Sequence, residues 1–145
     1  MVQFERLDPA VILVVEDDAL VQLELADWLA ELGLTVLTAD NADQALVVLN
    51  ARTDIEFMIS DIQMPGSMDG ISLAHHVAER WPKISILVVS GMFQTPLSAL
   101  PAGSRFFPKP FDRQKLWEAL SGSDAPGAPI APPARLRPPP RSGCA

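Results

Sequence analysis

The chain has 145 residues, of which 48% are hydrophobic and 20% are charged, a composition that suits one globular domain with a buried core. It contains no apolar run of the roughly 18 residues that a membrane span requires, and its N-terminus lacks the pattern of a signal peptide. The single cysteine, Cys144, excludes an internal disulfide and a cysteine metal cage. These features predict a cytoplasmic protein that does not cross a membrane.

Charge is distributed unevenly along the chain. Within the net charge of −7, residues 1–123 contribute −9, from 8 basic and 17 acidic side chains, and residues 124–145 contribute +2. An excess of acids repels the phosphates of nucleic acids, so we expect no binding to DNA or RNA. A metal cation or a basic partner surface is the more natural counter-charge.

Short β-branched or apolar runs alternate with segments of helical spacing through most of residues 1–123. In chain order, this pattern predicts a strand at 11–15, a helix at 20–32, a strand at 34–38, a helix at 42–50, a strand at 57–60, a helix at 71–80, a strand at 84–89, a strand at 105–107 and a helix at 111–120. In the first helix, Leu20, Leu23, Leu25, Trp28, Leu29 and Leu32 are expected to form one broad apolar face.

Helix ends are marked by residues with known capping preferences. Gly33 suits the C-terminal end of the first helix, and Asn41 and Asp112 suit the N-caps of later helices. Between Ser90 and Lys109, Pro101 disfavours a helix just before it, so the fourth helix is predicted to be short or irregular, with one turn at 97–99.

Strands that alternate with helices predict a parallel sheet covered by helices on both faces. We therefore expect an α/β fold, a flavodoxin-like doubly wound five-stranded sheet of strand order 2-1-3-4-5. An N-terminal extension (1–9) would precede this domain (10–123). Residues 124–145 contain seven prolines and are expected to form a disordered tail.

Charged and hydroxyl side chains stand at the carboxyl ends of the predicted strands, where ligands bind in sheets of this kind. These residues are Glu16, Asp17 and Asp18, then Asp61, then Ser90, then Lys109. Clustered carboxylates form a hard-oxygen site that suits Mg²⁺, and the cation would offset the charge of an incoming phosphoryl group. One carboxylate could itself act as the nucleophile, while Lys109 offers a positive charge and Ser90 a hydroxyl donor.

Four short motifs carry a family resemblance: VVEDD at 14–18, DIQMPG at 61–66, VVSG at 88–91 and KPF at 109–111. In this order, and near these spacings, they resemble the receiver domains of two-component response regulators over about residues 10–120. Three departures are visible. Asp18 adds a third acid to the first cluster, the loop at 64–70 looks one residue longer, and the stretch between Ser90 and Lys109 looks about three residues shorter.

The resemblance implies a role for each matching position. Asp61 would be the phosphoacceptor; Asp17 a direct Mg²⁺ ligand; Glu16 a ligand acting through water; Gln63 a ligand through its backbone carbonyl; Lys109 and Ser90 the catalytic lysine and switch hydroxyl; and Phe106 the switch aromatic. The Lys109-Pro110 bond resembles one that the family holds cis, as X-Pro bonds can be.

As a whole, the resemblance implies a phosphoacceptor in a histidine-to-aspartate phosphorelay, with Mg²⁺ as cofactor and a sensor histidine kinase or histidine phosphotransfer protein as partner. It would catalyse only its own phosphorylation and slow autodephosphorylation. The short fourth helix predicts a monomer or a weak dimer.

Several alternatives remain open at this stage. A degenerate receiver that binds partners without phosphate is disfavoured by the intact set of acids, hydroxyl and lysine. A phosphohydrolase with an aspartyl nucleophile is disfavoured because Gln63 stands where such enzymes carry a second Asp. Asp17 or Asp18 could simply cap the first helix, and Asp61 could be a loop-turn residue before Pro65. His75 and His76 are expected to be surface or partly packed residues.

Overall fold

The computed structural model describes residues 6–63, 68–91, 97–110 and 112–122. The elements are β1 (Val11–Val15), α1 (Ala19–Glu31), β2 (Thr35–Ala39), α2 (Ala42–Ala51), β3 (Ile55–Asp61), α3 (Gly70–Arg80), β4 (Ser85–Ser90), the 3₁₀ helix η1 (Leu97–Ala99), β5 (Arg105–Pro108) and α4 (Arg113–Ser121). The predicted tail, and the loop segments 64–67 and 92–96, lie outside the described residues.

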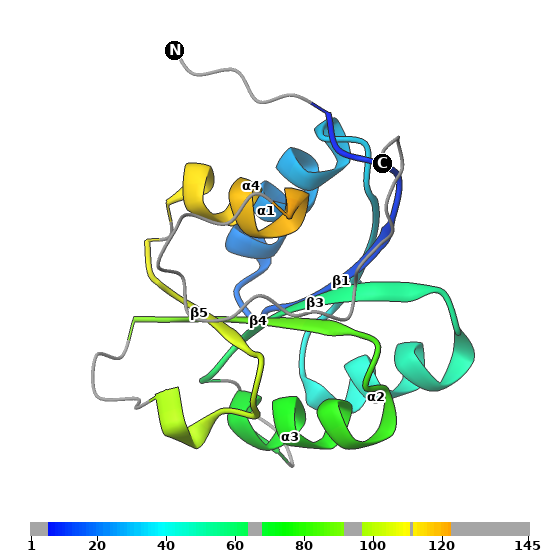
Figure 1. The fold of residues 1–145 in the computed structure, drawn as a ribbon, viewed down its shortest axis with the longest axis vertical. Helices are drawn as coiled ribbons and strands as arrows, with labels where there is room; N and C mark the ends of the chain where they lie inside the picture. Colours follow the sequence, from blue (N-terminus) through cyan, green and yellow to red (C-terminus); the bar gives the residue numbers. More distant parts are fainter. Residues whose placement is uncertain (1–5, 64–67, 92–96, 111, 123–145) are drawn as a thin grey trace.

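The five strands form one parallel sheet with the order β2-β1-β3-β4-β5. Helices α1 and α4 lie against one face of this sheet, and α2 and α3 lie against the other (Figure 1). The predicted fold class and strand order are therefore confirmed.

The burial of the strands follows from this double cover. In β1, β3 and β4, which are paired on both sides, nearly every side chain is buried. Successive residues point to opposite faces, so Leu13 packs with α2 and α3, whereas Val14 packs with α1 and α4. The edge strand β2 is more exposed, because only one of its sides is paired.

Each α-helix begins at a polar cap. The side chains of Asp18, Asn41, Asp69 and Asp112 accept hydrogen bonds from backbone N–H groups in the first turns of α1, α2, α3 and α4. The predicted caps Asn41 and Asp112 are thus confirmed. At the other end of α1, Gly33 has a φ of 99°, a conformation that glycine adopts without steric cost.

The predicted apolar face of α1 is partly wrong. Leu25, Trp28, Leu29 and Leu32 are buried, but Leu20 and Leu23 are 63% and 57% exposed. Each helical residue advances by about 100° around the axis, so Leu23 points about 200° away from Leu25. The spacing of these leucines covers two opposite faces of the helix, and only one of them meets the sheet.

The connection between β4 and β5 contains the predicted single turn, now seen as η1. Leu100, which follows it, is buried against the α2–α3 side of the core. His75 on α3 holds the same turn, since its Nε2 lies 2.7 Å from the carbonyl oxygen of Ala99. For the described residues, this confirms the expectation that the helix between β4 and β5 is short.

Candidate functional site

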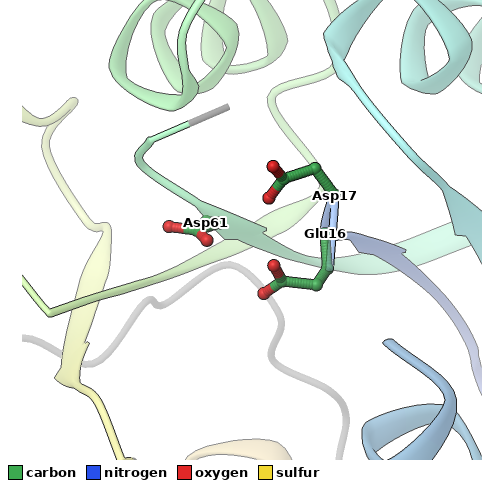
Figure 2. A group of neighbouring side chains, drawn as sticks. All are labelled: Glu16, Asp17 and Asp61. Atoms are coloured by element: carbon green, nitrogen blue, oxygen red, sulfur yellow. The ribbon is translucent and has the colours of Figure 1, made fainter. Parts of the chain in front are cut away.

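Two neighbouring strand ends bring three carboxylates together. β1 and β3 pair in register, with Val15 opposite Ser60, so Glu16 and Asp17 leave β1 beside the point where Asp61 ends β3. The three side chains project from these two strand ends in Figure 2, and a carboxylate oxygen from each lies within 4.8 Å of the others. Glu16 and Asp61 are buried, whereas Asp17 is exposed.

Lys109 reaches this cluster from the end of β5. Its backbone N–H donates to the carbonyl oxygen of Ser90 at 2.9 Å, which extends the pairing of β5 with β4. From there its Nζ donates to Glu16 Oε1 at 3.0 Å and to Asp61 Oδ2 at 2.8 Å. The Lys109-Pro110 peptide bond that follows is cis, as the resemblance implied.

The electrostatics of the cluster favour a further cation. Burial, together with the nearby charge of Asp61, raises the pKa of Glu16 despite its hydrogen bonds from Asp18 and Lys109. For Lys109, burial acts to lower the pKa, but the hydrogen bonds and charges of Asp61 and Glu16 outweigh it, and the net pKa is raised. Lys109 carries one positive charge, which balances only part of the negative charge of the three carboxylates.

Asp18, whose role the sequence left open, caps α1. Its Oδ1 accepts from the backbone N–H groups of Leu20 and Val21 at 3.0 and 3.2 Å. Its own backbone N–H donates to Glu16 Oε2 at 3.1 Å. Asp18 thus turns the chain from β1 into α1 and holds the Glu16 carboxylate from one side, while Lys109 holds the other oxygen.

Asp61 is fixed by its own chain neighbours. The backbone N–H of Gln63 donates to Asp61 Oδ1 at 3.1 Å, and the Ser60 hydroxyl donates to the Asp61 carbonyl oxygen at 3.0 Å. Gly70, at the start of α3, presses against the same peptide. A Cβ added there would lie 2.0 Å from the Asp61 carbonyl oxygen and 2.6 Å from the Cα of Ile62.

The two predicted switch residues lie on the strands beyond Asp61. Ser90 is buried at the end of β4, one residue past the Val89 that pairs with Asp61. Phe106 on β5 pairs with Val88 and is half-buried against the α2–α3 side of the core. The structure thus brings Glu16, Asp17, Asp61 and Lys109 into one cluster. It places Ser90 at the margin of this cluster and Phe106 on the face of the sheet that α2 and α3 cover.

Two residues near the site were not identified from the sequence. Gly70 gave no signal, because glycine is costly in the middle of a helix, whereas Gly70 is the first residue of α3. Gln22 gave no signal, because one glutamine near the start of a helix looks like an ordinary surface residue. Its contacts with the ends of β1 and β2 appear only in three dimensions.

Comparison with known proteins gives a consistent result. Residues 12–121 match the family model of the response regulator receiver domain. The DNA-binding transcriptional regulator NtrC of Salmonella typhimurium is 33% identical over 105 residues, which cover 70% of this chain but only 22% of NtrC.

Two solved structures show the same relationship. The signal receiver domain of an HD domain-containing protein from Pseudomonas fluorescens Pf-5 is 26% identical, with a TM-score of 0.70 over 80% of this chain and 94% of that one. The response regulator protein TrrA of Thermotoga maritima, solved in complex with Mg²⁺-BeF, is 26% identical, with a TM-score of 0.61 over 74% of this chain and 94% of that one. Among the described helices of this chain, none has the length and hydrophobicity of a membrane span.

Proposed function

Because the chain belongs to the family of response regulator receiver domains, we propose that it accepts a phosphoryl group on Asp61 within a histidine-to-aspartate phosphorelay. The observation that carries this proposal is the cluster of Glu16, Asp17 and Asp61 with the Lys109 ammonium group bound to two of the three carboxylates. Phosphorylation would then change which partner the domain binds.

The donor set fits a divalent cation. Three carboxylate oxygens within 4.8 Å of one another are the ligand type that Mg²⁺ prefers, and the negative charge of the cluster exceeds the single positive charge of Lys109. Asp17 and Asp61, with Glu16 through water and the backbone carbonyl of Gln63, would hold the ion. When bound, Mg²⁺ would offset the charge of the phosphoryl oxygens. The relative TrrA was solved in complex with Mg²⁺-BeF, which supports the choice of Mg²⁺ as the cation.

The protein's own groups supply the remaining chemistry. The Asp61 carboxylate attacks the phosphorus of a phosphohistidine on a sensor kinase or phosphotransfer protein, so a P–O bond forms as the P–N bond breaks, and the leaving imidazole takes up a proton. Lys109 Nζ, already 2.8 Å from Asp61 Oδ2, would donate to a phosphoryl oxygen. The Ser90 hydroxyl, at the end of the next strand, would donate to another.

The test uses Mg²⁺ and acetyl phosphate, with intact mass as the readout. We expect the wild-type protein to gain the mass of one phosphoryl group and Asp61→Asn to gain none. Asp54→Asn is the matched control, because Asp54 precedes the opposite end of β3, is exposed and pairs with Arg52. It should label like the wild type.

Three other results would contradict the proposal. Labelling of Asp61→Asn at the wild-type level would place the acceptor elsewhere. An unreactive wild-type protein would indicate a degenerate receiver, and continuous release of phosphate would indicate a hydrolase.

A further inference from the structure

The side chain of Gln22 lies between the ends of two strands. Gln22 stands in the first turn of α1, and its Nε2 donates to the carbonyl oxygen of Glu16 at 3.0 Å, to that of Ala39 at 3.1 Å and to Asp40 Oδ1 at 3.0 Å. All three neighbours are oxygen acceptors, so this position needs a donor. The two N–H groups of the amide are shared among them.

This amide continues the sheet where its backbone pairing ends. Val15 and Ala39 are the last pair in the register of β1 and β2, and the Glu16 N–H still donates to the Ala39 carbonyl at 3.0 Å. The carbonyl of Glu16 points on toward α1, where Gln22 meets it. That carbonyl belongs to the planar peptide that joins Glu16 to Asp17, so Gln22 fixes the orientation of this peptide.

Asp17 depends on that orientation. Its side chain is exposed, so packing against the core does not set its direction, whereas the buried Glu16 and Asp61 are held by Lys109. We propose that Gln22 is a positioning residue for the metal site, which holds the Glu16–Asp17 peptide so that the Asp17 carboxylate faces Glu16 and Asp61. This inference rests on the proposed function, because it concerns the same Mg²⁺ site.

Substitutions at Gln22 separate positioning from simple electrostatics. Gln22→Met removes the donor but keeps the length and the neutral charge of the side chain. Gln22→Glu also removes the donor, but it adds a negative charge beside a cation site. Electrostatics alone predicts that Gln22→Glu binds Mg²⁺ more tightly, whereas positioning predicts that both variants bind it more weakly.

Gln44→Met is the matched control. Gln44 stands in the first turn of α2, and its Oε1 accepts from the Asp40 N–H at 2.9 Å. Its replacement removes a side-chain hydrogen bond at the same strand end without touching the Glu16–Asp17 peptide. Thermal unfolding of the metal-free variants would show whether the two substitutions cost similar stability.

The experiment is a titration of the full chain with Mg²⁺, followed by NMR. We expect the Kd for Mg²⁺ to rise about tenfold in Gln22→Met and in Gln22→Glu, the lower end of the effect of groups that orient metal ligands. Gln44→Met should keep the wild-type Kd. The amide resonance of Asp17 should shift in metal-free Gln22→Met but not in Gln44→Met.

Each outcome separates this inference from the proposed function. A wild-type Kd in Gln22→Met, or tighter binding in Gln22→Glu, would overturn the positioning role. The metal site itself would still be upheld if the wild-type protein bound Mg²⁺ and Asp17→Asn did not. An equal rise of the Kd in Gln44→Met would mean that both substitutions only loosen the strand ends, and it would also overturn the positioning role. A wild-type protein that binds no Mg²⁺ would overturn both.

Discussion

At the scale of single residues, Lys109 determines the charge balance of the site. Its Nζ contacts Glu16 Oε1 and Asp61 Oδ2, so it holds together two acids that would otherwise repel each other. The same ammonium group also repels a metal ion that approaches those acids. Lys109 therefore acts in opposite directions on metal affinity and on phosphoryl transfer.

This opposition gives a prediction for Lys109→Met. Removing the positive charge should raise the affinity for Mg²⁺ severalfold, because the cation then meets the three carboxylates without the competing charge of Lys109. The rate of phosphorylation by acetyl phosphate should nevertheless fall about a hundredfold or more, since a donor to the phosphoryl group is lost. An Mg²⁺ titration and a mass-resolved time course would measure the two effects.

Lys115→Met serves as the control for this prediction. Lys115 is exposed in the first turn of α4, so its removal changes the net charge equally without removing a group of the site. Affinity and rate that moved in the same direction in Lys109→Met would argue against its double role.

At the scale of elements, the sequence predicts which strand ends meet but not how side chains bridge them. Short apolar runs located all five strands, and their parallel order placed Glu16, Asp17, Asp61 and Lys109 together at the carboxyl ends of the strands. Boundaries differ from the prediction by at most two residues: pairing extends β3 past the predicted 57–60 to Ile55 and Asp61, whereas β2 and β4 each begin and end one residue later than predicted.

Two features at this scale could not be read from the sequence. Helix α1 is apolar on both sides, so composition alone did not say which leucines face the sheet. The contact of Gly70 with the Asp61 peptide joins two segments across a loop whose path no local pattern determines.

The close approach of α3 to the end of β3 predicts a strong effect of Gly70→Ala. The added Cβ would lie 2.0 Å from the Asp61 carbonyl oxygen, so the helix start or the Asp61 peptide must move. We expect a loss of about 3 kcal/mol in the free energy of unfolding and slower phosphorylation, because the acceptor is displaced. Urea unfolding and acetyl phosphate labelling would measure these effects.

Gly91→Ala is the control for this substitution. A Cβ at Gly91 meets no atom within 4 Å, so its free energy of unfolding should stay within about 0.5 kcal/mol of the wild-type value. Equal stability of Gly70→Ala and the wild type would show that α3 adjusts without cost.

At the scale of the whole molecule, the site lies where the winding of the sheet reverses. From β1 the chain runs outward to β2, and then it returns past β1 to β3, β4 and β5. The connections after β1 and β3 therefore leave toward opposite faces of the sheet, α1 on one and α3 on the other, and open a crevice between the two strand ends. The acids at these two ends occupy that crevice, and Lys109 reaches it from the distant edge strand β5.

The surface formed by η1, β5 and α4 offers little apolar area for self-association. Where a longer helix would offer apolar area, η1 has only three residues, and the Leu100 that follows is buried in the core. On α4, Leu116 and Leu120 are also buried, while residues 113–115 expose Arg, Gln and Lys side chains. A stable interface buries about 1,600 Å² in total and has an apolar centre, which the described residues of this surface do not supply.

We therefore predict that the protein is mainly monomeric, with and without Mg²⁺ and beryllofluoride. Light scattering at micromolar concentration should give the mass of one chain in both conditions. The two conditions are compared because phosphorylation would act on Ser90 and Phe106, which lie at the border of this surface. A tight dimer that formed only with beryllofluoride, and that was lost on substitution of Ser98 and Trp117, would show that this small surface suffices for dimerisation.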